Sequence, residues 1–234
     1  IGLLSLASYL ESQNLSVEVL DCLGPDAPRT IAEKVARILA HKPTLVGFST
    51  TTSAFLDAYD MAVAIKALAP QTRIVFGGVH VSALGASLME AYPAIDYLAL
   101  GEGEVTLTEL AQGVALPDIR GLIWRDGDRI VENLPRLNLP TLDDFPFPAY
   151  HKLADFPRGY HLPPFSYVQT PGTAIATSRG CVYQCSYCDR KELKKGFRAN
   201  SAEYTYEHMS MLRKRFGIGH VNIYDDLFTV NRKR

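Results

Sequence analysis

Residues 45–49 read Leu-Val-Gly-Phe-Ser, and residues 73–78 read Arg-Ile-Val-Phe-Gly-Gly. Each stretch is a short apolar run next to polar or glycine residues, as is typical of buried strands. Between them, residues 54–69 carry apolar side chains at helical spacing, and Pro70 ends that helix. Strands that alternate with helices in this way imply a parallel sheet with helices on both faces. The stretch therefore predicts an α/β fold.

The same alternation continues on both sides of this stretch. The other predicted helices cover residues 3–13, 30–40, 82–92 and 104–113, and the other predicted strands cover residues 16–21 and 97–100. Thr30 and Glu33 have the spacing of a capping box at the start of the second of these helices. Residues 121–133 change character and predict a β-hairpin with a tight turn. These elements predict a Rossmann-like (flavodoxin-like) domain with a parallel sheet over residues 1–133.

The second half of the chain is organised differently. Residues 134–172 are rich in proline and aromatic residues and show no periodicity, which indicates a linker that packs against another part of the protein. Residues 173–234 then predict a strand at 174–177, a loop, a helix at 202–216 and a second strand at 220–224. This order is the opening of a (β/α) barrel, in which the site lies at the C-terminal ends of the strands.

Cys181, Cys185 and Cys188 form a C-x₃-C-x₂-C run in the loop after the strand at 174–177. Three thiolates on one tight loop can hold three corners of a [4Fe–4S] cluster, which leaves one iron open to a ligand. A structural zinc site is the main alternative, but it needs a fourth ligand, and Cys22 is far away in the sequence. A disulfide is less favoured, because no signal peptide opens the chain.

The cysteine spacing, with Tyr187 directly before the last cysteine, resembles the signature of the radical S-adenosylmethionine (SAM) family. The resemblance implies that the open iron binds the amino acid part of SAM and that Tyr187 lies beside the adenine. It also implies that Asp225 and Asp226, which follow the strand at 220–224, contact the amino group of SAM. The alternatives are a shielding role for Tyr187 and a solvated helix cap for the two aspartates.

Three loops of the first half resemble those of the cobalamin-binding domain found ahead of many radical SAM cores. The first is a row of hydroxyls after residue 48, the second follows the strand at 73–76 and includes a pair of glycines, and the third follows the strand at 97–100. The residues that the resemblance assigns to cobalamin binding are Ser49, Thr50, Thr51, Gly77, Gly78, Val79, Gly101, Glu102 and Gly103. The resemblance extends through the hairpin and the Phe-Pro-Phe-Pro run at 145–148, so it covers nearly the whole chain.

The sequence departs from one cobalamin pattern. Proteins that ligate the cobalt with histidine use an Asp-x-His-x-x-Gly loop, and here Leu23 occupies the histidine position. We therefore do not expect a histidine-ligated cobalt from that loop. His80 is either a neighbour of the corrin or a structural residue, and the second is favoured. The alternative for this half is a flavodoxin-like scaffold with an empty pocket, whereas the dinucleotide fingerprint G-x-G-x-x-G is absent.

Taken together, these features predict a fragment of a cobalamin-dependent radical SAM enzyme that lacks both ends. We expect it to be inactive by itself, because the later barrel strands are missing. SAM would be cleaved reductively at the [4Fe–4S] cluster, and the favoured outcome is methylation of an unactivated carbon. The alternatives are a radical cyclisation or rearrangement with cobalamin in another role, and a non-catalytic iron–sulfur or structural metal module. The expected partners are a small-molecule or peptide substrate and an electron donor such as flavodoxin or ferredoxin.

Charge and hydropathy restrict the partners further. The net charge of −1 gives no electrostatic reason for binding nucleic acid or a membrane surface. No apolar run reaches the roughly 18 residues of a membrane span. Reduced cysteines and an oxygen-sensitive cluster favour the cytoplasm.

Overall fold

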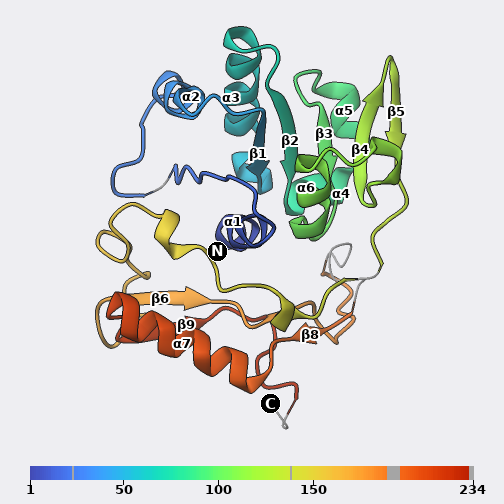
Figure 1. Cartoon of the computed structure of the whole chain (residues 1–234). Helices are drawn as coiled ribbons and strands as arrows, with labels where there is room; N and C mark the ends of the chain where they lie inside the picture. The colour runs from blue at the N-terminus through green and yellow to red at the C-terminus, as the bar shows by residue number, and fades with distance from the viewer. Residues whose placement is uncertain (23, 138, 189–195, 232–234) are drawn as a thin grey trace. The chain divides into compact units, whose positions relative to one another are not determined.

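The computed structural model describes residues 1–22, 24–137, 139–188 and 196–231 (Figure 1). The chain divides into two compact units. We call residues 13–16 and 27–138 the sheet unit, and residues 1–12, 17–26 and 139–234 the cysteine unit. Each unit has a hydrophobic core of its own.

The sheet unit is built on a five-stranded sheet in the order β1-β2-β3-β4-β5. The strands are β1 (Leu45–Ser49), β2 (Arg73–Gly77), β3 (Tyr97–Ala99), β4 (Leu122–Asp126) and β5 (Arg129–Glu132). The first three pair in parallel, as predicted. The predicted hairpin is the antiparallel pair β4–β5, and it extends the sheet because β4 pairs antiparallel with β3. The sheet is therefore mixed rather than purely parallel.

Helices connect the strands of the sheet unit. They are α2 (Ile31–Ala40), α3 (Phe55–Leu68), α4 (Val79–Leu84), α5 (Ser87–Ala91) and α6 (Glu104–Ala111), with 3₁₀ turns η1 (Thr52–Ala54) and η2 (Leu116–Asp118). The capping box is confirmed, because the Glu33 amide donates to the Thr30 hydroxyl and the Thr30 amide donates to the Glu33 carboxylate. The single helix predicted at 82–92 is wrong. The chain there forms two short helices, because Gly85 takes a φ of +60° and ends the first.

The core of the sheet unit explains why the apolar pattern of residues 45–78 predicted its strands and helix. Ile65 of α3, Ile74 and Phe76 of β2, and Leu98 of β3 are fully buried in one cluster. Burial of a large apolar side chain stabilises the fold by about 1.5–3 kcal/mol. The apolar periodicity of residues 45–78 is thus the periodicity of this core.

The cysteine unit contains the predicted strand–loop–helix–strand order. Strands β6 (Gly172–Ile175) and β9 (His220–Ile223) pair in parallel, and α7 (Ala202–Phe216) connects back to β9. Figure 1 shows α7 running alongside this pair, and Ile175 and Leu212 are fully buried together. Strand β6 begins two residues earlier than predicted. Helix α7 ends at Phe216, as predicted, and Gly217 follows it with a φ of +67°.

The proline-rich segment wraps against α7. It contains the 3₁₀ turns η3 (Leu142–Asp144) and η4 (Tyr150–Lys152) and places aromatic rings on the helix. The Phe147 ring stacks on His208 at a centroid distance of 4.9 Å, and the Tyr150 side chain is buried. The prediction that this segment packs against another part of the chain is therefore confirmed.

The N-terminal residues differ from the prediction. Residues 16–21 do not form a strand, because no strand of the described residues lies beside them to complete a ladder. The side chain of Val19 packs instead on the core of the cysteine unit. Helix α1 (Gly2–Ser12) belongs to the same unit: Leu4 is part of that core, and the Leu4 carbonyl accepts from the Ala149 amide at 3.0 Å. This grouping differs from the predicted division, which placed all of residues 1–133 in one domain.

No helix in the described part of the chain combines the length and the apolarity that crossing a membrane would need.

Candidate functional site

The loops after β1 and β2 are bound to each other at the carboxyl edge of the sheet. The Thr50 amide donates to the Gly77 carbonyl at 2.9 Å, and the His80 amide donates to the Thr50 carbonyl at 3.4 Å. Thr50 itself is only 4% exposed. The structure thus brings together residues that the sequence placed in separate loops, and hydrogen bonds join their backbones.

Gly78 is required by this contact. Its φ is +95°, and a Cβ added there would lie 2.7 Å from the Thr50 carbonyl oxygen and 2.8 Å from the Thr50 nitrogen. Because glycine has no side chain, paired glycines after a strand can allow the backbone to approach a ligand closely. The structure shows that the close approach of Gly78 is to the neighbouring loop.

The third loop joins the same edge through Ser82. The Ser82 hydroxyl donates to the Gly78 carbonyl at 3.1 Å and accepts from the Gly101 amide at 2.9 Å. Glu102 and Gly103 continue this loop into α6 and are half-buried. At the same edge Thr51 and Val79 are exposed, with Val79 56% exposed. The result is a rigid rim that presents hydroxyls and an apolar side chain to solvent.

His80 has two neighbours within the sheet unit. Its Nδ1 and the Thr52 hydroxyl are hydrogen-bonded at 3.1 Å, and its ring lies 4.6 Å from the Phe55 ring. These contacts hold the imidazole in place and favour the structural role. Leu23, the other position considered for the cobalt, lies outside the described residues.

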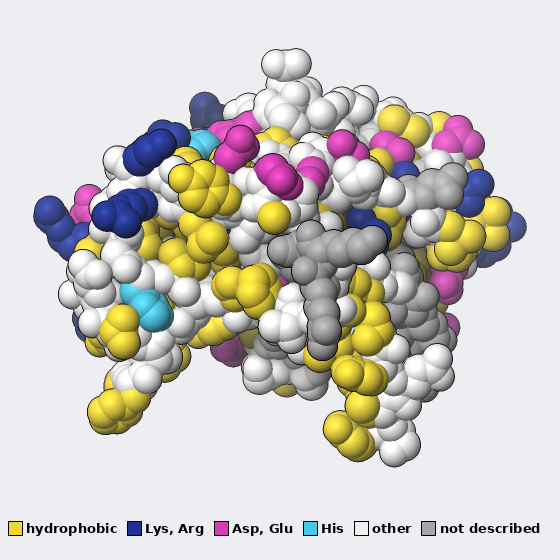
Figure 2. Space-filling view, turned by 90° about the horizontal axis from the view of Figure 1, so that it is seen from below, with side chains coloured by type: hydrophobic (Ala, Val, Ile, Leu, Met, Phe, Trp, Pro, Cys, Tyr) yellow, Lys and Arg dark blue, Asp and Glu magenta, His cyan; other side chains and the backbone are white. Residues whose placement is uncertain are grey.

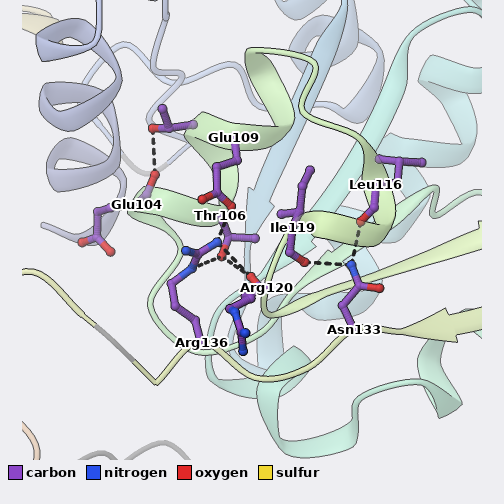
Figure 3. Close-up of polar contacts among 9 residues, drawn as sticks. Glu104, Thr106, Glu109, Leu116, Ile119, Arg120, Asn133 and Arg136 are labelled. Carbon is purple, nitrogen blue, oxygen red and sulfur yellow. Dashed lines mark hydrogen bonds and ion pairs between the residues drawn. The ribbon is translucent and has the colours of Figure 1, made fainter.

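Arg136 anchors the end of the sheet unit next to the third loop (Figure 3). Sequence reasoning missed this residue. Its Nε donates to the Thr106 hydroxyl at 3.2 Å, and its Nη2 donates to the Glu109 carboxylate and, at 3.1 Å, to the Arg120 carbonyl. Nearby, the Asn133 side-chain amide donates to the carbonyls of Leu116, in the η2 turn, and of Ile119, directly after it. No motif marks Arg136; only its place at the end of the hairpin could have suggested an anchor.

The cysteine loop follows β7 (Ser178–Arg179), which pairs antiparallel with β8 (Arg198–Ala199). Cys181 and Cys185 are half-buried free thiols, Cys188 is exposed, and the Cys188 amide donates to the Cys185 carbonyl at 3.2 Å. Within the described ranges, no three Cys, His, Asp or Glu side chains converge as metal ligands do. The three thiols on one loop nevertheless match the donor set of an iron–sulfur cluster.

Tyr187 is 90% exposed. Figure 2 shows hydrophobic side chains standing out from one face of the molecule. Phe165 and Val168 of the cysteine unit are as exposed as Tyr187. The Tyr187 ring is therefore open to a planar ligand beside the cysteine loop.

The two aspartates after β9 differ in their contacts. One oxygen of Asp225 accepts from the Thr177 amide at 2.5 Å and from the Ser178 amide at 3.0 Å, and the other accepts from the Thr177 hydroxyl at 2.6 Å. Asp226 is exposed. Asp225 therefore binds the start of the cysteine loop, whereas the Asp226 carboxylate faces solvent.

The chain resembles known proteins along its whole length. Residues 1–111 match the B12 binding domain family. Over 239 residues the chain is 31% identical to an uncharacterized methyltransferase of Pyrococcus horikoshii, covering all of this chain and 50% of that protein. Over 160 residues it is 30% identical to the cobalamin-dependent radical SAM methyltransferase TokK of Streptomyces tokunonensis, covering 63% of this chain and 22% of that protein. The chain is a relative of the cobalamin-dependent radical SAM proteins.

Two further matches define this relationship. The chain is 28% identical over 238 residues to an anaerobic magnesium-protoporphyrin IX monomethyl ester cyclase of Synechocystis, covering 99% of this chain and 46% of that protein. Its fold matches the radical SAM methyltransferase TsrM of Kitasatospora setae, solved with cobalamin and a [4Fe–4S] cluster, with a TM-score of 0.65 and 23% identity over 96% of this chain and 44% of that one. The predicted α/β fold is confirmed. The chain spans about half the length of the curated relatives that it matches over its whole length.

Proposed function

We propose that this chain is the cobalamin- and cluster-binding part of a radical SAM methyltransferase. The observation that carries the proposal is that one chain combines a match to the B12 binding domain with a three-cysteine loop after the first of two parallel strands. Cys181, Cys185 and Cys188 would hold the [4Fe–4S] cluster. The rim formed by the loops at Thr50, Gly78 and Gly101 would hold cobalamin.

Different residues of the chain would contact different parts of these cofactors. When bound, the cluster with SAM supplies radical chemistry and cobalamin supplies methyl transfer. The Asp226 carboxylate is exposed and would pair with the ammonium group of SAM, and the Tyr187 ring would cover its adenine. The exposed Val79 side chain offers an apolar contact to a corrin ring. The Thr51 hydroxyl on the same rim would hydrogen-bond to its polar substituents.

The substrate and partners follow from the same relationship. We propose a small-molecule substrate, with a peptide as the alternative, and a flavodoxin or ferredoxin as electron donor. A radical cyclisation is the second candidate, because the chain also aligns over 99% of its length with a cyclase.

Anaerobic reconstitution with iron and sulfide tests the cluster. The wild-type chain is expected to take up about four irons. Cys181→Ala, Cys185→Ala and Cys188→Ala should each lose most of that iron. Cys22→Ala is the matched control and should retain it. Stoichiometric zinc after anaerobic purification, or equal iron in all four variants, would contradict the proposal.

A labelling experiment separates methyl transfer from cyclisation. The full-length protein, loaded with hydroxocobalamin and reduced, is incubated with SAM labelled on its methyl group. Label in the extracted corrinoid is expected for a methyltransferase. Cleavage of SAM to 5′-deoxyadenosine without label in the corrinoid would favour the cyclisation reading.

A further inference from the structure

The two ends of the cysteine loop lie side by side in the cysteine unit. Ser178 pairs with Ala199 and Arg179 with Arg198 in the β7–β8 ladder. The Asn200 amide also donates to the Thr177 carbonyl at 2.9 Å. We call residues 177–179 the entering stem and residues 198–201 the leaving stem. Because the stems are paired, the position of the three thiols depends on what holds this short ladder.

Asp225 holds the entering stem from β9. Its carboxylate accepts from two consecutive backbone amides, those of Thr177 and Ser178, and from the Thr177 hydroxyl, all within 3.0 Å. Hydrogen bonds to an ionised acceptor are about twice as strong as neutral ones. The chain just after β9 is thereby bonded to the chain just after β6, and Ser178 lies three residues before Cys181.

Asp143 of the proline-rich segment holds the leaving stem. One of its oxygens accepts from the Asn200 side-chain amide and from the Ser201 backbone amide, both at 3.0 Å. Ser201 is also the N-cap of α7, where its hydroxyl accepts from the Tyr204 amide at 3.0 Å. A single carboxylate thus joins the end of the loop, the start of α7 and the η3 turn.

The residues around Asp143 add contacts to the same ladder. Arg198 donates to the Pro140 carbonyl at 2.7 Å, and the Arg179 guanidinium lies 5.3 Å from the centre of the Phe145 ring. The Tyr204 hydroxyl donates to the Phe145 carbonyl at 3.0 Å. Both stems therefore contact residues 140–145 of the proline-rich segment, which lie more than 30 residues earlier in the sequence.

We propose that Asp225 and Asp143 are positioning residues that clamp the two stems of the cysteine loop. The clamp is independent of the ligand, whereas its consequence for an iron–sulfur cluster rests on the proposed function. Gathering three thiolates from a loose loop costs conformational entropy, and fixing both ends of the loop beforehand removes part of that cost. Asp225 acts through the backbone and need not touch SAM, so the two adjacent aspartates have separate roles.

Amide hydrogen exchange of the chain without iron tests the clamp itself. Asp225→Ala is expected to speed exchange at Thr177 and Ser178 by about tenfold or more, because charge-assisted bonds are lost. Asp143→Ala should do the same at Ser201. Glu207→Ala, which removes an exposed carboxylate from α7, is the matched control and should change neither stem.

Two checks keep the result interpretable. The β2 amides should exchange as in the wild type, which shows that the sheet unit has stayed folded. Asp225→Asn and Asp143→Asn keep an accepting oxygen without the charge, and they are expected to give intermediate rates even if an alanine variant fails to fold. Wild-type exchange at both stems in all four aspartate variants would overturn the clamp.

Iron release to a chelator after reconstitution tests whether the clamp helps the loop to hold an iron–sulfur cluster. Asp225→Ala and Asp143→Ala should release iron about tenfold faster than the wild type and Glu207→Ala, as expected if the loop ends are freed. Faster exchange with unchanged iron release would overturn the positioning role. If the wild-type chain takes up no iron while the exchange changes appear, the proposed cluster is wrong and the clamp is supported.

Discussion

Gly78 shows how a single residue determines the geometry of the sheet rim. Its φ of +95° and the 2.7 Å between an added Cβ and the Thr50 carbonyl both exclude a side chain. Gly85 also has a positive φ, +60°, but an added Cβ there would meet nothing within 4 Å. A side chain at Gly85 would therefore meet only the cost of a left-handed backbone, whereas a side chain at Gly78 would also clash with Thr50.

Gly78→Ala is expected to destabilise the sheet unit more than Gly85→Ala does. A left-handed backbone costs a non-glycine residue about 1–2 kcal/mol, and Gly78→Ala adds the clash with Thr50 to that cost. Urea unfolding followed by the fluorescence of Trp124, the single tryptophan, measures this because Trp124 lies in β4. Gly78→Ala should also weaken the spectral response to hydroxocobalamin. Equal destabilisation by the two variants would show that the contact with Thr50 is unimportant.

Single residues also show where sequence reasoning reached its limit. The cysteine spacing was visible because all three thiols are local in the sequence. Asp225 and Asp226 are identical neighbours, and only the fold shows that Asp225 binds the Thr177 backbone 48 residues away. Asp225 and Asp226 therefore have different roles, and Asp226 remains the candidate for the contact with SAM.

At the scale of elements, α6, the hairpin and the start of the proline-rich segment are joined by Arg136. Its side chain is 10% exposed and that of its partner Glu109 is 27% exposed. The hairpin also carries the Arg129–Asp126 pair, whose side chains are 80% and 49% exposed. Burial distinguishes these two ion pairs, which are similar in chemistry.

Arg136→Leu is expected to destabilise the sheet unit by about 2–4 kcal/mol, because it leaves Glu109 and the Arg120 carbonyl without their donor. Arg129→Leu should cost at most about 1 kcal/mol, since exposed pairs contribute little. Trp124 fluorescence during urea unfolding measures both. A similar small loss in the two variants would indicate that the Arg136 network is not an anchor.

The elements that were predicted well are those whose pattern is local. Strands β1 and β2 and helix α3 carry their core side chains at regular spacing, and the Thr30 capping box lies within four residues. The prediction failed at residues 16–21, because a strand also needs a neighbour, which the sequence around it does not reveal. It failed again at Gly85, where one glycine splits a periodic segment into two helices.

At the scale of the whole chain, two separate hydrophobic cores imply that the two units respond differently to acid. His208 in the core of the cysteine unit is 3% exposed, and its Nε2 is hydrogen-bonded to the Tyr150 hydroxyl at 3.2 Å. Burial lowers the pKa of His208 from its ordinary value of 6.5 to about 4.

Acidification from pH 7 to pH 5 is therefore expected to destabilise the cysteine unit selectively. The lowered pKa means that the unfolded state binds the proton first, so the stability from neutral His208 is present above pH 6.5 and is lost as the pH falls towards 4. The loss should be about 2 kcal/mol at pH 5. Hydrogen exchange, corrected for its intrinsic pH dependence, should show weaker protection in α7 and unchanged protection in β2. His208→Phe keeps an aromatic ring without a titrating group, so it should remove the pH dependence of hydrogen-exchange protection in α7. Equal loss of protection in α7 and β2 of the wild-type chain would contradict this account.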